Sequence, residues 1–80
     1  MKARIFVTLK AGVLDPQGQA IQRALAALGF DGVASVRQGK VFDIELADGV
    51  GSGERLTAMC EKLLANTVVE EYRVELRDGP

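Results

Sequence analysis

The chain has 80 residues, enough for one small domain over residues 1–80, and its ten basic and eleven acidic side chains are too evenly balanced for a nucleic-acid-binding surface. It has no histidine and one cysteine, Cys60, which excludes an intrachain disulfide and a Cys/His zinc site. No apolar run is long enough to span a membrane, and the N-terminus lacks the apolar segment of a signal peptide. We therefore expect a soluble, cytoplasmic protein.

The first predicted strand, Ala3–Lys10, alternates apolar and polar residues, as a strand with one buried face does. A helix should follow, because Asp15 is a suitable cap and Pro16 suits the first helical position. Gly29 can adopt the left-handed conformation that ends this helix. Gly18 lowers its helix propensity, which the close approach of another backbone would explain. The buried stripe, at helical spacing, consists of Ile21, Ala24, Leu25 and Leu28.

The middle of the chain is predicted to form a hairpin from Val33–Arg37 and Lys40–Ala47, with Gln38 and Gly39 in its turn. A glycine-punctuated loop, Asp48–Gly53, follows the second strand of this hairpin. Its glycines lack the spacing of a phosphate-binding loop, so we expect a connector.

A second helix and a last strand complete the predicted order. Ser52 is the expected helix cap, Asn66 the expected stop, and Val68–Leu76 the closing strand. The apolar stripe of this helix consists of Leu56, Met59, Cys60, Leu63 and Leu64. The order predicts an α+β fold of the ferredoxin-like βαββαβ type, an antiparallel sheet with two helices on one face. The uncovered face, a natural docking surface, would display Arg4, Phe6, Thr8, Lys10, Asp43, Glu45, Glu71 and Arg73.

The candidate reactive groups have structural interpretations as well. Cys60 lies in an apolar stripe, and a reactive thiol needs exposure and a nearby positive charge, so we expect a buried structural thiol. Lys10, Arg37 and Lys40 either gather at one end of the sheet to hold an anion or are solvated edge charges. The residues alone leave these two alternatives open.

Six motifs along the chain carry a more specific signal, and they are Val7–Lys10, Gly12–Gly18, Leu28–Phe30, Val36–Lys40, Cys60–Asn66 and Glu70–Tyr72. Together they resemble the PurS family, the small subunits of phosphoribosylformylglycinamidine synthase in purine biosynthesis. The resemblance covers nearly the whole chain, in matching order and at matching length. Thr67 departs from the proline that the family often has there, which should only relax the turn before the last strand.

The resemblance implies a PurS-like fold and a non-catalytic role. In that family a glutaminase subunit, PurQ, releases ammonia, and a synthetase subunit, PurL, uses ATP to form the amidine. A PurS homodimer, or a tetramer, brings the two together and assists ammonia transfer. The resemblance implies no metal or cofactor bound by this subunit, although the complex uses ATP, Mg²⁺ and glutamine, and no nucleic-acid or membrane partner. The residues expected to contact partners are Lys10, Asp15, Gln17, Gly18, Arg37, Lys40, Asn66, Glu71 and Tyr72.

An ACT-like small-molecule-sensing regulatory domain has the same element order and is the main alternative. An amino acid would stabilise such a domain thermally, whereas a PurS subunit would associate on mixing with PurL and PurQ. An acylphosphatase-type enzyme needs an arginine in the loop after the first strand, which Lys10–Gly18 lacks. Single-stranded RNA binding needs more aromatic residues on the open sheet face than Phe6.

Overall fold

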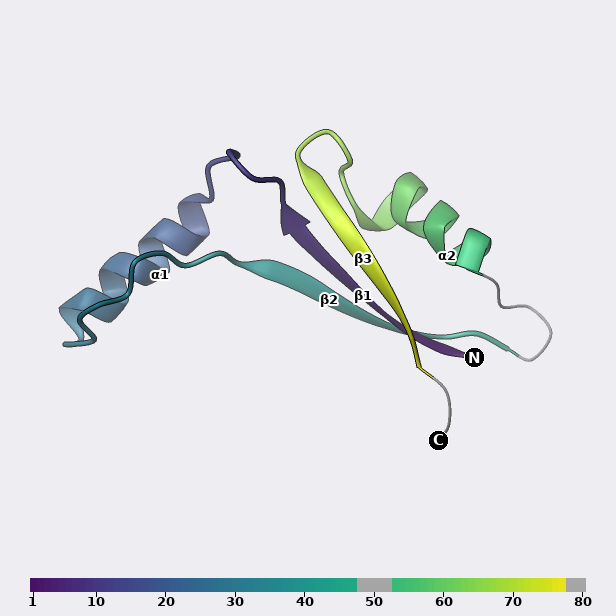
Figure 1. The fold of residues 1–80 in the computed structure, drawn as a ribbon, viewed down its shortest axis with the longest axis horizontal. Coiled ribbons are helices and arrows are strands. Elements are labelled where there is room, and N and C mark those ends of the chain that lie inside the picture. The colour runs from purple at the N-terminus through teal and green to yellow at the C-terminus, as the bar shows by residue number, and fades with distance from the viewer. Residues whose placement is uncertain (48–52, 78–80) are drawn as a thin grey trace.

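The computed structural model of the protein describes residues 1–47 and 53–77 (Figure 1). The elements are β1 (Lys2–Leu9), α1 (Pro16–Ala27), β2 (Gly39–Glu45), α2 (Gly53–Met59), η1 (Cys60–Leu64) and β3 (Glu70–Arg77), where η1 is a π-helical continuation of α2. The predicted α+β class with an antiparallel sheet is confirmed, and the element order is consistent with the ferredoxin-like type. The predicted cap Ser52, most of the loop before it and the last three residues lie outside the described ranges.

The sheet has the strand order β2-β1-β3, with β1 in the centre and both neighbours antiparallel to it. Alternation along β1 directs Ala3, Ile5 and Val7 into the core, where none is more than 2% exposed. Ile5 lies between Phe42 of β2 and Val74 of β3 across the two ladders. The alternation predicted for the first strand is therefore confirmed.

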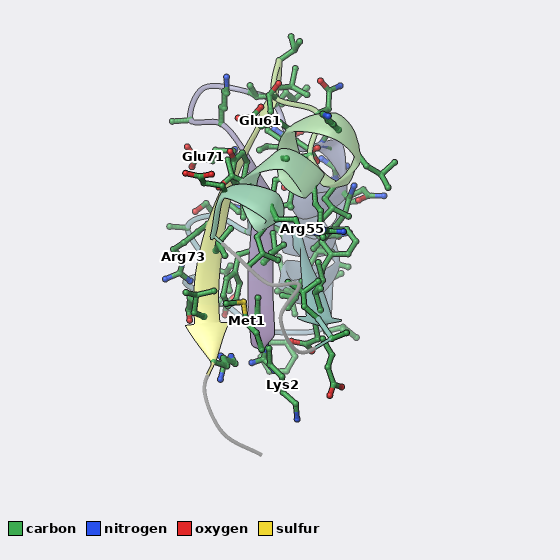
Figure 2. All side chains as sticks on the ribbon, turned by 90° about the vertical axis from the view of Figure 1, so that its right-hand side faces the viewer. Met1, Lys2, Arg55, Glu61, Glu71 and Arg73 are labelled. Carbon is green, nitrogen blue, oxygen red and sulfur yellow. The ribbon has the colours of Figure 1, made fainter. Side chains whose placement is uncertain are left out.

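The second helix packs on the inner face of the sheet, and Figure 2 shows α2 crossing in front of the strands. Leu56 and Cys60 are fully buried against β1. The N–H of Ala65 donates to the carbonyl of Cys60 at 3.0 Å, the i→i+5 bond of a π-helical turn. This wider turn changes the direction of the side chains that follow. As a result Leu63, which we expected in the buried stripe, is 83% exposed.

The first helix begins and ends where the sequence predicts. Asp15 is its N-cap and Pro16 occupies its first position. At the other end Gly29 has a φ of +94°, and the N–H of Phe30 donates to the carbonyl of Leu25 at 3.0 Å. Local signals thus define both ends of α1.

The position of α1 differs from the expected one. In this single copy the helix lies beyond the end of the sheet instead of over its face, which makes the molecule elongated, with extents of 50 × 31 × 14 Å (Figure 1). The periodicity of an apolar stripe shows which side of a helix seeks cover, but not which surface supplies it. The contacts that hold α1 in this position are to the chain segment just before β2.

That segment, residues 33–37, was predicted as a strand, and the structure assigns no strand to it. The predicted turn at Gln38 is also wrong, because the chain runs directly from this segment into β2 (Figure 1). Its polar backbone groups bind α1 instead of a neighbouring strand. The side-chain amide of Gln22 in α1 donates to the carbonyls of Val33 (3.2 Å) and Ala34 (3.1 Å).

Candidate partner-binding site

The C-terminal end of β1, the start of α1 and the start of β2 meet between α1 and the sheet (Figure 1). Most of the residues predicted to contact partners are found here. We define the polar junction as Lys10, Asp15, Gln17, Gly18, Arg37, Gln38 and Lys40. A hollow of about 180 Å³ opens at the junction, and its lining includes Asp15, Gln17, Gln38 and Lys40 together with Thr8 and Glu70.

Asp15 is the centre of the polar junction and is only 6% exposed. Its Oδ1 accepts a hydrogen bond from the N–H of Gly18 and its Oδ2 one from the N–H of Gln38, both at 2.8 Å. The bond from Gln38 is the largest cause, and that from Gly18 the next, of a lowered pKa of Asp15. One carboxylate therefore joins the start of α1 to the start of β2.

Arg37 fastens the turn between β1 and α1. Its Nη1 donates to the carbonyl of Val13 at 3.1 Å, and its Nη2 donates to those of Leu9 at 3.2 Å and Lys10 at 3.1 Å. The planar guanidinium suits this arrangement because its donors diverge in fixed directions. These contacts favour a structural role for Arg37 over the anion-binding alternative.

Gly18 is buried where α1 passes closest to the segment before β2. A methyl group at this position would overlap the carbonyl oxygen of Val36 and approach Oδ2 of Asp15 to 2.9 Å. The predicted close approach of another backbone is therefore confirmed. Beside it, Oε1 of Gln17 accepts a hydrogen bond from Nε2 of Gln38 at 2.8 Å, so side chains and backbone both hold the two segments together.

Asn66 is linked to the polar junction through Glu70. Oε1 of Glu70 accepts the N–H of Asn66 at 2.7 Å, and Oε2 lies 3.8 Å from Nζ of Lys40. Oδ1 of Asn66 in turn accepts the N–H of Val68 at 3.2 Å. Because Lys40 is the second residue of β2 and Glu70 is the first of β3, this chain of contacts spans the central strand.

Tyr72 and Glu71 lie apart from the junction and on opposite faces of β3. The hydroxyl of Tyr72 donates to Oε1 of Glu61 at 2.8 Å, which is the largest cause of a raised pKa of Tyr72. Glu71 is exposed on the other face, opposite Thr8 of β1 (Figure 2). The nine predicted residues therefore do not form one site.

Sequence reasoning missed three residues that organise these contacts: Gln38, Glu61 and Glu70. Gln38 was placed in a hairpin turn, and nothing in its local sequence indicates a bond to Asp15. A glutamate on the outer side of a predicted helix or at a strand end is ordinarily solvated. Their partners are distant in the chain, so only the fold reveals them.

The described ranges contain little that could do chemistry. No cluster of three or more His, Cys, Asp or Glu able to hold a metal occurs in them. Cys60 is a buried free thiol whose pKa is raised mainly by desolvation, the opposite of an activated cysteine. None of the helices placed there is long and apolar enough to cross a bilayer. The polar junction thus offers a fixed shape and hydrogen-bonding groups, which suit binding to another protein.

A second candidate surface is apolar. We define the helix groove, a hollow of about 390 Å³ between the second helix and β2, by its lining residues Ile44, Arg55, Ala58, Met59, Lys62, Leu63 and Leu64. Two members of the α1 stripe are exposed at the far end of the molecule, Ile21 by 39% and Leu28 by 73%. A single copy leaves both surfaces without apolar cover.

Comparisons of sequence with known proteins give a consistent result. The family model described as PurS: Phosphoribosylformylglycinamidine (FGAM) synthase matches residues 2–78. Phosphoribosylformylglycinamidine synthase subunit PurS of Mycobacterium leprae is 49% identical over 73 residues, which cover 91% of this chain and 91% of that protein.

Comparisons of structure agree. Bacillus subtilis PurS superposes with a TM-score of 0.86 at 44% identity, over 96% of this chain and 98% of that chain. A chain in the structure of PurLQS from Thermotoga maritima has a TM-score of 0.78 at 36% identity, over 92% of this chain and 93% of that chain. The similarity therefore extends over nearly the whole sequence and fold.

Proposed function

The chain belongs to the PurS family of FGAM synthase subunits, and on that basis we propose that it joins the glutaminase PurQ to the synthetase PurL and assists the passage of ammonia between them. The agreement of family, sequence and fold over nearly the whole chain, including similarity to a chain of PurLQS, carries this proposal. The family match favours a subunit of this ligase over an ACT-like sensing domain.

We assign contact with the larger subunits to the polar junction. Four of its side chains, those of Asp15, Gln17, Arg37 and Gln38, are held by hydrogen bonds to one another or to the backbone. A surface fixed in this way loses little conformational entropy when a partner binds. The hollow of about 180 Å³ gives the partner a place for one or two side chains.

The chemistry of ammonia explains why such a subunit is useful. Ammonia in water at neutral pH is largely protonated and diffuses away, whereas a closed route keeps the uncharged nucleophile close to its acceptor. In this proposal the complex uses ATP, Mg²⁺ and glutamine, and this chain binds none of the three itself. The complex acts in the cytoplasm, where purine biosynthesis generally takes place. This chain contributes shape and contact surfaces.

The same proposal includes a homodimer in which α1 of one copy packs into the helix groove of the other. A ferredoxin-like sheet face takes two helices side by side, and in a single copy α2 occupies only part of that face. The exposed Ile21 and Leu28 of α1 match the apolar groove lined by Met59 and Leu63. Mutual exchange of α1 would bury both surfaces.

The decisive experiment measures amidine formation by purified PurL and PurQ with and without this chain. We expect glutamine to support the reaction only when all three proteins are present. Replacing glutamine with a high concentration of ammonium chloride is the control, because free ammonia reaches PurL without a bridge. A full glutamine-dependent rate in the absence of this chain would contradict the proposal.

A further inference from the structure

The hollow of about 180 Å³ at the polar junction has walls from two parts of the chain. Asp15 and Gln17 lie on the side of α1, whereas Thr8 and Glu70 belong to the sheet. By volume the hollow takes on the order of six water molecules, which is room for the end of one long side chain. The charged groups of its lining are the carboxylates of Asp15 and Glu70 and the ammonium of Lys40. Two negative charges and one positive charge leave a net charge of −1, which favours a cationic guest.

Glu70 has one carboxylate oxygen that lacks a hydrogen-bond donor in the described part of the chain. Its side chain is only 16% exposed. Oε1 accepts the N–H of Asn66 at 2.7 Å. Nζ of Lys40, the ion-pair partner of Oε2, lies 3.8 Å from it, which is beyond hydrogen-bonding distance. A largely buried carboxylate oxygen is stabilised when a donor reaches it, so this atom favours a further donor.

Lys40 is a weak partner for this oxygen and can be displaced. Its side chain is 60% exposed, and an exposed ion pair at such a distance contributes little stability. Lys40 thus marks a place where positive charge is favoured, and a cation that brings several donors would bind there more strongly. Arg37 cannot take that place, because its Nη atoms are bonded to three backbone carbonyls of the turn before α1.

We propose that an arginine of one of the larger subunits inserts its guanidinium into this hollow and binds Oε2 of Glu70 in place of Lys40. The donors of the planar guanidinium diverge in fixed directions, so one group can reach Glu70 on the sheet and acceptors on the α1 side together. Each carboxylate oxygen of Asp15 accepts one hydrogen bond, as does Oε1 of Gln17, and each has a lone pair left. The inserted arginine therefore ties the start of α1 to the sheet.

This inference rests on the function proposed above, since it names the chemistry of the group that the polar junction receives. An acidic group is the opposite alternative. It would have to lie against the carboxylates of Asp15 and Glu70, and the repulsion from two negative charges would exceed the attraction of Lys40. The charges of the lining therefore select the cation.

The test measures the concentration of this chain that gives half-maximal glutamine-dependent amidine formation with PurL and PurQ. Glu70→Gln keeps an acceptor for the N–H of Asn66 but removes the charge, so the half-maximal concentration should rise by about tenfold or more. Lys40→Met removes the competing ammonium and keeps the length of the side chain, so the half-maximal concentration should fall, by up to about fivefold. This fall should vanish when Glu70→Gln is also present, because both changes act through the same carboxylate.

The controls separate an effect at the hollow from a general effect of charge or folding. Glu54→Gln at the start of α2 and Lys2→Met at the start of β1 make the same changes away from the hollow and should leave the half-maximal concentration unchanged. Circular dichroism and analytical ultracentrifugation report whether each variant keeps its fold and its assembly mass. With ammonium chloride in place of glutamine, all variants should give the same rate, because free ammonia needs no bridge.

The inference is overturned if Glu70→Gln keeps the half-maximal concentration of the unmodified chain, or if Lys40→Met fails to lower it. A rise for Lys40→Met with no effect of Glu70→Gln would place an acidic group of the larger subunit in the hollow instead. Failure of the proposed function has a different signature, because the unmodified chain itself would then not stimulate amidine formation from glutamine. The inference would fall with it.

Discussion

Oδ2 of Asp15 accepts a hydrogen bond of 2.8 Å from the backbone N–H of Gln38, which lies 23 residues further along the chain. With the bond from Gly18 to Oδ1, it fixes α1 along the segment that leads into β2. This carboxylate is thus a central one of the groups that set the direction in which α1 leaves the sheet. Partner binding through the polar junction and exchange of α1 between copies both rely on this direction.

The lowered pKa of Asp15 predicts a specific pH dependence. Because the folded pKa lies below the unfolded value of about 3.9, the stabilisation is fully present above that value and is lost as the pH falls through the folded pKa. Urea unfolding between about pH 5 and pH 2 should show a steeper loss of stability in the unmodified chain than in Asp15→Asn. Equal slopes for the two proteins would contradict this assignment.

Replacing Arg37 by lysine should loosen α1 without unfolding the sheet. A single ammonium cannot reach the carbonyls of Leu9, Lys10 and Val13 together, so we expect a loss of about 1–2 kcal/mol from the missing hydrogen bonds. Compared with the unmodified chain, the variant should show a larger increase in the hydrogen-exchange rate of α1 than in that of β1. Arg23→Lys on the exposed side of α1 is the matched control and should change neither quantity.

Gly18→Ala tests two opposing effects. Helix propensity alone predicts a gain of about 1 kcal/mol, whereas the overlap of the new methyl group with the carbonyl of Val36 predicts a loss of about 1–3 kcal/mol. We expect the overlap to dominate and Tm to fall. Gly53→Ala at the start of α2 is the control, because a methyl group there meets nothing within 4 Å, so its Tm should not fall.

The single tyrosine makes the Tyr72–Glu61 hydrogen bond directly measurable. Its raised pKa means that the stabilisation is present below the unfolded value of about 10 and is lost as the pH rises through the folded pKa. Titration of the tyrosinate absorbance should give a pKa above that of the urea-unfolded chain. Glu61→Gln should bring the folded value closer to the unfolded one, and no change would exclude Glu61 as the main cause.

The sequence predicts the features that depend on residues close together in the chain, such as the ends of a helix. The structure differs from the prediction where contacts between residues far apart in the chain determine the outcome. Asp15 and Gly29 delimit α1 as expected. A glycine in the first turn of a helix is unfavourable, and from this the sequence predicts the close backbone approach found at Gly18. The exposure of Leu63 was unpredictable, because a π-helical turn has the same apolar composition as an α-helical one.

The candidate site shows the same division. The sequence left open whether Lys10, Arg37 and Lys40 gather, and the structure places Arg37 on the carbonyl of Lys10 and brings Lys40 and Asp15 to the lining of one hollow. The bonds that define their roles, such as that from Gln38 to Asp15, depend on the segment before β2 lying along α1. Alternation in residues 33–37 predicts a strand equally well, so no pattern distinguishes the two arrangements.

Two residues with almost the same exposed fraction, Leu63 and Val68, should respond differently to substitution if the helix groove binds α1 of another copy. Leu63 is 83% exposed and Val68 is 81% exposed in the single copy, and only Leu63 lines the groove. A charge placed where α1 of another copy packs would have to be buried without a partner, which is strongly unfavourable. Leu63→Arg should therefore dissociate the homodimer at concentrations where Val68→Arg leaves it intact, as measured by analytical ultracentrifugation. If both variants kept the mass of the unmodified chain, α1 would have to be covered by something other than the helix groove.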